Sequence, residues 1–213
     1  MRIVKEAEER KEEILDAAER LFGTKGFDNT STNDILEEVG IARGTLYYHF
    51  KSKEEILDGV IRRMTERMMA EAGKIVRNRE LSLLERLTKA ILSLNVESQI
   101  GNEVMEQVHR PQNALMHQKM QKRLLVGINP IFTELIEEGV REGICHTDYP
   151  EEAVEMTMLY ANTAFDSIDI NDLSQEEKEK KIAGFIYNVE RLMGMEQGSL
   201  QEALMQIFQR GEI

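Results

Sequence analysis

A short window of the chain, Gly40 to Lys53 (GIARGTLYYHFKSK), concentrates the side chains that are best suited to bind a polyanion. It contains three basic residues, a histidine and two adjacent tyrosines, and it contains no acidic residue. The whole chain is acidic by contrast, with 27 Lys and Arg residues against 39 Asp and Glu residues and a net charge of −12. A surface of that overall sign repels nucleic acids and anionic membranes. Contact with DNA would therefore be confined to a local patch, and this window is the candidate.

The window offers hydrogen bonding to phosphates and to the edges of bases. Arg43 supplies donors suited to phosphates and to base edges in the major groove. Thr45, Tyr48 and His49 add further donors and acceptors on the same predicted helix. Gly44 has no side chain, so it lets the backbone approach a ligand closely.

Two lysines, Lys51 and Lys53, follow the aromatic residues at the start of the next predicted helix. Free backbone N–H groups at a helix start also favour a phosphate, so we expect these lysines to contact the DNA backbone. Tyr47 and Tyr48 have an alternative interpretation as half-buried aromatics of the core. Because neighbours on a helix point about 100° apart, only one of the two can be buried in that way.

The residues on either side of Gly40 predict two short helices joined by a tight turn. Ser31-Thr-Asn-Asp34 resembles a capping box, in which a serine and an acidic residue satisfy each other's backbone N–H groups. Ile35 and Val39 give this helix its buried side, and Gly40 ends it because glycine tolerates a positive φ. Residues 41–50 form the next helix. The pattern is that of a helix-turn-helix, whose second helix enters the major groove of DNA.

The rest of the chain predicts helices as well, because apolar residues recur at helical spacing and no sustained alternation indicates a strand. A first helix is expected from about Ala7 to Gly23, and Ser52-Lys-Glu-Glu55 is a capping box that opens a long fourth helix reaching Val76. Further helices are expected at residues 83–98, at 104–126 with an interruption at Pro111, from a break or kink at Pro130 to Gly143, and at 151–168, 176–193 and 200–208. The fold class is therefore all-α. We expect a helix-turn-helix domain at residues 1–60 and a larger helical domain at residues 61–213.

The composition favours a globular protein of a reducing compartment. The single cysteine, Cys145, excludes an intramolecular disulfide. The first residues contain no apolar run of the kind found in signal peptides, and no stretch approaches the roughly 20 apolar residues that span a bilayer. We therefore expect a cytoplasmic protein without a membrane partner.

The stretch TSTNDILEEVGIARGTLYYHFKSKEEIL, and above all its GTLYYHFKSKEE run, resembles the N-terminal domain of TetR-family (TetR/AcrR) transcriptional regulators. The likeness extends from about Arg10 to Ile61, and beyond residue 70 it is reduced to helix order and the segment EEGVREGICHTDYPEEA. The resemblance implies that Thr32, Tyr47, Tyr48, His49 and Lys53 bind phosphates, whereas Arg43, Gly44 and Thr45 face the bases. The expected function is that of a ligand-responsive transcriptional repressor.

A second prediction concerns the oligomeric state. Residues 156–165 (MTMLYANTAF) carry no charge, and a helix that is apolar nearly all round must be buried on more than one side. The following helix adds an apolar stripe at i, i+3 and i+4 spacing. Two such helices from each chain would form a four-helix homodimer interface and present two recognition helices to a palindromic operator. The expected interface residues are Met156, Leu159, Phe165, Ile182, Phe185, Ile186, Val189 and Met193.

The 12 methionines have two equally weighted interpretations, because flexible thioethers fill cores and also line malleable pockets. If they line an effector pocket, its expected residues are Met68, Met105, His109, Met116, Met120, Phe132 and Tyr160. This set is apolar with few polar groups, which favours a hydrophobic or amphipathic small molecule over a sugar or a nucleotide. No cofactor is expected.

Two other classes of function remain as alternatives. An all-helical enzyme would need a nucleophile–base pair or a metal site, and the sequence contains no motif for either. The spacing of Cys145, His146, His109 and His117 does not match the ligand pairs of zinc sites. The second alternative is a DNA-binding protein without an effector, although residues 61–213 are more than dimerisation alone requires.

Overall fold

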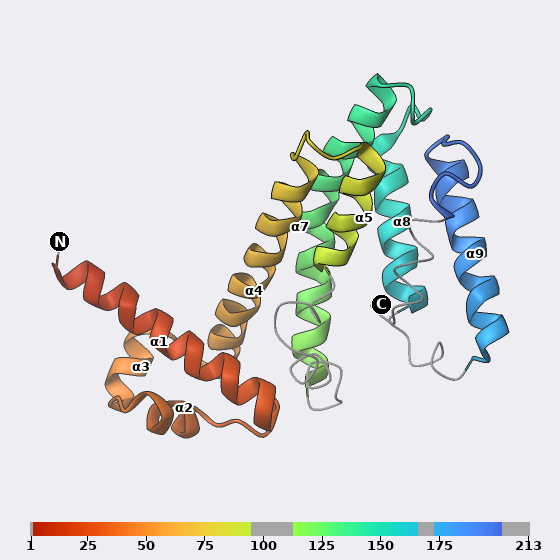
Figure 1. Cartoon of the computed structure of the whole chain (residues 1–213). Helices are drawn as coiled ribbons and strands as arrows, with labels where there is room; N and C mark the ends of the chain where they lie inside the picture. The colour runs from red at the N-terminus through yellow and green to blue at the C-terminus, as the bar shows by residue number, and fades with distance from the viewer. Residues whose placement is uncertain (1, 95–112, 166–172, 202–213) are drawn as a thin grey trace. The chain divides into compact units, whose positions relative to one another are not determined.

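The computed structural model defines residues 2–94, 113–165 and 173–201. Within these ranges most residues are helical and no strand is present (Figure 1). The helices are α1 (Arg2–Lys25), α2 (Thr32–Val39), α3 (Arg43–His49), α4 (Lys53–Val76), α5 (Leu83–Leu94), α7 (Ala114–Arg141), α8 (Pro150–Phe165) and α9 (Gln175–Leu192). The all-α class predicted from the sequence is confirmed. Pro111 and residues 202–208 of the last predicted helix lie outside the described residues.

The chain divides into two compact units, and α4 and α7 contribute residues to both. The first unit comprises Met1–Arg67 and Val96–Arg123, and the second comprises Met68–Asn95 and Leu124–Ile213. The division within α4 thus follows Arg67. The domain boundary expected at residue 60 is set by the end of the helix-turn-helix motif, whereas the division after Arg67 is one of compactness. The expected boundary between a DNA-binding part and the rest of the chain therefore stays a prediction.

The core of the first unit is formed by α1, α2, α3 and the first half of α4. Apolar residues recur along α1 at helical spacing, and Ile14 and Phe22 on that face are fully buried. Ile35 of α2 and Leu46 of α3 are fully buried as well. The buried apolar residues that α4 adds to this unit are Ile56, Leu57, Val60, Ile61 and Met64. Because each short helix buries one face here, the opposite face of α3 is left to solvent.

Ion pairs join α1 to α4 at the edge of this core. The guanidinium of Arg63 lies 2.9 Å from the carboxylate of Glu12 and 2.7 Å from that of Asp16. It also pairs with Glu19. A cluster of three carboxylates around one half-buried guanidinium is less screened than an isolated surface pair. These contacts therefore help to fix α4 against the helix-turn-helix.

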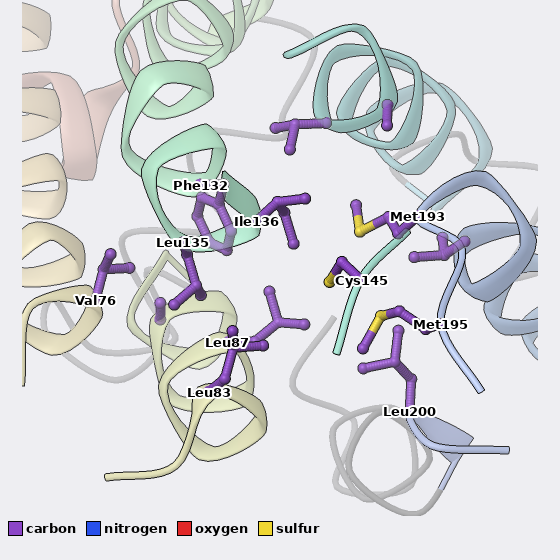
Figure 2. Packing of buried hydrophobic residues seen from close by; sticks show 14 of the residues in the cluster. Val76, Leu83, Leu87, Phe132, Leu135, Ile136, Cys145, Met193, Met195 and Leu200 are labelled. Carbon is purple, nitrogen blue, oxygen red and sulfur yellow. The ribbon is translucent and has the colours of Figure 1, made fainter. Parts of the chain in front are cut away.

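The core of the second unit is centred on α7 (Figure 2). Phe132, Leu135 and Ile136 lie on its buried face. The other members labelled in Figure 2 come from α4, α5, the loop after α7 and the segment at the end of α9, and they are Val76, Leu83, Leu87, Cys145, Met193, Met195 and Leu200. A Cβ atom at Gly139 would lie 2.7 Å from the Sγ of Cys145, so glycine at this position lets the loop return closely against α7.

α7 continues through Pro130 without a break, whereas the sequence predicted one helix ending near Val126 and another that Pro130 opens or kinks. That boundary is wrong. Proline inside a helix loses one hydrogen bond and costs about 3 kcal/mol. Ile128 and Phe132, on either side of the proline, are both buried, and their packing offsets this cost.

A buried ion pair joins α5 to α7 in the second unit. The guanidinium of Arg86 donates to both carboxylate oxygens of Glu138 at 2.9 and 2.6 Å, and the two side chains are 3% and 7% exposed. Arg86 also donates to the backbone carbonyl of Val76, the last residue of α4, at 2.9 Å. Arg79 supplies Glu138 with a second, exposed partner. The pair therefore fixes the C-terminus of α4 to α5 and α7.

Candidate nucleic-acid interface

The start and the end of α2 follow directly from its sequence. The hydroxyl of Ser31 accepts from the backbone N–H of Asp34 at 3.2 Å, and the carboxylate of Asp34 accepts from the backbone N–H of Ser31 at 2.7 Å. Gly40 ends the helix with a φ of 72°, a conformation that costs most residues about 1–2 kcal/mol. The capping box and the glycine turn predicted from the sequence are thus confirmed.

Ion pairs with α1 compensate two of the three acidic residues of α2. Lys25 lies 2.7 Å from Asp34, and Arg20 lies 3.2 Å from Glu38. Hydrogen bonds from Lys25 and Ser31 hold the pKa of Asp34 well below its usual range. The carboxylate therefore stays charged and paired, which reduces the negative potential that it would otherwise add beside α3.

α3 buries one residue deeply and exposes its opposite face. Leu46 is fully buried, whereas Tyr47 and Tyr48 are 45% and 79% exposed. The alternative interpretation of the tyrosines as core aromatics is therefore wrong for both. Arg43 and Gly44 are exposed on the same short helix. This face can thus reach a ligand without any rearrangement of the core.

Arg43 is held by a partner that the sequence did not indicate. Its guanidinium donates to the side-chain carbonyl of Asn33 on α2 at 2.9 Å. The contact spans the turn at Gly40, and no helical periodicity relates its two residues. Asn33 is consequently a neighbour of the predicted site that sequence reasoning missed. It orients Arg43 and lies on the same surface.

Lys53 has an intramolecular partner instead of pointing freely outward. Its ammonium group donates to the backbone carbonyl of Phe27 at 2.8 Å and lies 4.2 Å from the centre of the Phe27 ring. Lys51 remains exposed. The predicted capping box at the start of α4 is only half formed, because the hydroxyl of Ser52 accepts from the N–H of Glu55 while the carboxylate of Glu55 binds the N–H of Lys51.

The remaining predicted DNA contacts are half-buried. Thr32 is the first residue of α2, and Thr45 and His49 lie on α3. The His49 ring packs edge-on against Tyr48 with 5.0 Å between ring centres. The structure therefore gathers six of the predicted contacts on α3, namely Arg43, Gly44, Thr45, Tyr47, Tyr48 and His49, and places the other three at the starts of α2 and α4.

Two short helices at a glycine turn, with a polar second helix whose outer face is free, define a helix-turn-helix DNA-binding protein. The sequence model described as bacterial regulatory proteins of the tetR family matches residues 14–60, and the model described as the tetracyclin repressor-like C-terminal domain matches residues 96–187. The chain belongs to the TetR family of bacterial transcriptional regulators.

Relatives and solved structures agree with this family. The chain is 27% identical over 157 residues to the HTH-type transcriptional repressor KstR2 of Mycolicibacterium smegmatis, covering 68% of this chain and 72% of the relative. It is 26% identical over 183 residues to the uncharacterized HTH-type transcriptional regulator YfiR of Bacillus subtilis, covering 83% and 86%. The structure of SmeT, the repressor of the Stenotrophomonas maltophilia multidrug efflux pump SmeDEF, matches with a TM-score of 0.64 at 18% identity, covering 88% of this chain and 91% of SmeT. KstR2 and YfiR are transcriptional regulators, SmeT shares the fold, and the chain is a DNA-binding regulator of the TetR family.

The residues predicted to line an effector pocket are divided between the two units. Met116 and Met120 are buried in the first unit, and Met68 and Phe132 are buried in the second. Phe132 packs in the apolar core of α7, so its primary role is to fill that core. Tyr160 is exposed and stacks on Phe185, whereas Met105 and His109 lie outside the described residues.

The residues predicted to form a dimer interface fall into two groups, one buried in the core of its own chain and one exposed on its surface. The core of the chain itself includes Ile182, Ile186, Val189 and Met193. The prediction that this stripe of α9 faces a partner chain is therefore corrected, because the stripe packs within its own chain. The apolar period identified a buried face of α9, but not which surface buries it. Met156 and Leu159 are exposed on α8, and Phe185 is half-buried. Phe165 ends α8, and its side chain lies outside the described ones.

Metal and membrane sites receive no support from the part of the chain that the structure describes. No group of three or more His, Cys, Asp or Glu side chains in that part could hold a metal ion. Burial raises the pKa of the Cys145 thiol, which disfavours the thiolate that metals bind. None of the described helices is both long and apolar enough to cross a bilayer.

Proposed function

We propose that this regulator is a homodimeric repressor that binds a palindromic operator in the cytoplasm and leaves it when a small hydrophobic or amphipathic ligand binds. The observation that carries the DNA-binding part is the division of α3 between buried Leu46 and the exposed pair Tyr47 and Tyr48. Arg43 at the start of the same helix would read a guanine, and Gly44 would allow close approach. Thr32 and Lys51 would contact phosphates on either side of the groove.

The exposed faces of α8 and α9 support the homodimer. Met156, Leu159 and Tyr160 on α8 and Tyr187 on α9 are large apolar or aromatic side chains that face solvent in a single chain. Exposed apolar residues gathered on neighbouring helices mark interaction surfaces. A second copy related by a two-fold axis would bury the same surface on both chains.

A hollow between α8 and α9 lies on this surface. Its volume is about 380 Å³. The rings of Tyr160 and Phe185 stack in it, with 5.8 Å between their centres. The lining residues are Tyr160, Glu177, Lys180, Lys181, Gly184, Phe185 and Asn188. We propose that side chains of the second copy cover it, since charged residues surround an aromatic centre as at the rim of an interface.

The buried methionines support an apolar effector. Met116 and Met120 are buried within the first unit and Met68 within the second, and thioether side chains can rearrange around a ligand more easily than branched ones. Repression is relieved if the ligand favours a form of the dimer that cannot span two half-sites. A coupling free energy of about 1–3 kcal/mol is enough for a useful response.

DNA selection from a random duplex library tests this function directly. We expect the purified protein to enrich a palindromic site, and fluorescence anisotropy with that duplex should show a steep loss of affinity with added salt. Light scattering without DNA should return twice the mass of the chain. A protein that enriches no duplex, or that remains monomeric at micromolar concentration, contradicts the proposal.

A ligand screen by thermal shift tests the regulatory part. Compounds that stabilise the protein should also release the selected duplex, and saturating duplex should weaken their binding by the same factor, because the coupling is reciprocal. Unchanged ligand affinity with and without the duplex would leave a DNA-binding protein without this switch.

A further inference from the structure

The backbone of Phe27, in the loop between α1 and α2, is held from two sides. Its carbonyl accepts from the ammonium group of Lys53, the first residue of α4, at 2.8 Å. Its N–H donates to the side-chain carbonyl of Asn113, which directly precedes α7. Lys53 at the start of α4 and Asn113 just before α7 therefore both bind the backbone of one loop residue, Phe27.

Asn113 is built into the first unit. Its side chain is 1% exposed, although the residue lies 86 positions from Phe27 in the sequence. Its amide nitrogen also donates to the carbonyl of Phe22 in the last turns of α1 at 3.4 Å. One amide group thus binds both the end of α1 and the loop that follows it. Buried polar groups of the backbone are nearly always paired, and here a distant side chain supplies the partner.

The loop position determines where α2 begins. The carbonyl of Phe27 accepts from the N–H of Thr30 at 3.2 Å, and the buried hydroxyl of Thr30 donates to the carbonyl of Gly26 at 2.7 Å. The next residue, Ser31, is the N-cap of α2. A shift of Phe27 is therefore transmitted through a short, hydrogen-bonded turn to α2 and, across Gly40, to α3.

α7 connects this loop to the second unit. It is continuous from Ala114 to Arg141, and Ile128, Phe132 and Leu135 in its later turns belong to the core of that unit. A ligand that changes the packing of this core acts on the helix that directly follows Asn113, the partner of Phe27.

We propose that Asn113 is a positioning residue for DNA binding, which ties the start of α7 to the α1–α2 loop and gives the second unit a route to α3 besides α4. The inference rests on the proposed function, because it concerns the same DNA-binding helix. It assigns to Asn113 a role in operator affinity as well as in stability.

Four variants separate this role from a structural one. Asn113→Ala removes the partner of the Phe27 N–H, and Lys53→Met removes the partner of its carbonyl while keeping the length of the side chain. The double variant tests whether the two act together. Asp58→Asn is the matched control, because Asp58 pairs with Lys119 and so links α4 to α7 in the same unit at an exposed site without touching Phe27.

Operator affinity is measured by anisotropy with the duplex that the wild-type protein selects, at a temperature where each variant is folded. Hydrogen exchange of the Phe27 amide reports whether the loop is released. We expect Asn113→Ala to expose that amide and to lower affinity about tenfold, a coupling within the usual range for linked sites. Asp58→Asn should change affinity less than about twofold, as exposed pairs do. The double variant should lose less than the product of the single effects, since both contacts hold the backbone of the same residue.

Two results would overturn the inference. If Asn113→Ala exchanges the Phe27 amide rapidly but binds the duplex with wild-type affinity, Asn113 is only structural, and the proposed function still stands. If the wild-type protein selects no duplex, the proposed function and the inference both fail. Should Asn113→Ala not fold, Asn113→Ser leaves a smaller void and a hydroxyl at the site, and the same affinity and exchange measurements decide the question.

Discussion

At the scale of single residues, the interface depends on side chains that are oriented before DNA arrives. Arg43 is hydrogen-bonded to Asn33 at 2.9 Å, so its long side chain has lost part of its freedom already in the free protein. Preorganisation of this kind lowers the entropy cost of binding. Lys53, by contrast, donates a hydrogen bond to the carbonyl of Phe27, so we infer that it stabilises the α1–α2 loop in the free protein. The exposed Lys51 is therefore the better candidate for a phosphate contact.

Replacement of Arg43 by alanine should weaken binding to the selected operator by about 1–3 kcal/mol and relax the preference at one base pair. The reason is that the proposed pair of parallel hydrogen bonds to guanine would be lost. Lys51→Ala is the control, since loss of a phosphate contact should weaken all sequences about equally and reduce the salt slope by about one. Anisotropy titrations with single-base-pair variants of the operator measure both effects. Equal losses for every operator variant with Arg43→Ala would contradict its role in base reading.

At the scale of elements, two glycines near α3 have different roles. Gly40 has a φ of 72°, and nothing lies within 4 Å of a Cβ atom placed on it. Gly44 also has open space around it, but it lies inside α3 with ordinary helical geometry. Position 40 therefore requires glycine because of its positive φ. Position 44 has ordinary helical geometry and open space, so glycine is needed there only if a ligand approaches the backbone closely.

Gly40→Ala should lower the free energy of unfolding by about 1–2 kcal/mol, because alanine is strained at a positive φ. Gly44→Ala should leave stability unchanged or raise it by up to about 1 kcal/mol, because alanine favours a helix. The second variant should nevertheless weaken operator binding, since its methyl group would face the DNA in the proposed complex. Denaturant unfolding and anisotropy on the same samples test the pair. Normal operator binding by Gly44→Ala would show that this position does not approach DNA.

The outer faces of α8 and α9 give a second prediction at this scale. Leu159→Glu should shift the homodimer toward monomer by placing a charge in the proposed interface, where Leu159 is 44% exposed in the single chain. Val126→Glu, on the exposed side of α7, is the control and should leave the dimer intact. Sedimentation velocity across a concentration series measures the shift. A Leu159→Glu protein that stays dimeric would move the interface away from α8.

At the scale of the whole molecule, the acidic balance of the chain and its one basic window have separate effects. The net charge of −12 keeps the general surface from binding nucleic acid, so affinity depends on α3 and its flanks. The buried pair of Arg86 and Glu138 acts on stability instead. It joins the end of α4, the start of α5 and the end of α7 within the second unit.

Arg86→Met should lower the free energy of unfolding by about 3 kcal/mol, because it leaves Glu138 buried with only the exposed Arg79 as a partner. The double variant Arg86→Met with Glu138→Leu should recover most of this loss, since an apolar pair replaces a buried charge. Chemical denaturation measures both. A double variant as unstable as the single one would mean that the hydrogen bond to the Val76 carbonyl, and not the charge pair, is the main contribution.

The sequence alone determined the features that depend on local chemistry. The capping box at Ser31, the turn at Gly40 and the exposed polar residues of α3 follow from neighbouring residues, since capping, positive φ and helix period act over a few positions. The tertiary structure decided which surface buries each apolar stripe. Ile182 and Ile186 pack in their own chain's core, and α7 passes through Pro130, because packing free energy is summed over distant residues. The partners of Arg43 and Phe27 belong to the same class, since Asn33 and Asn113 meet them only after the chain has folded.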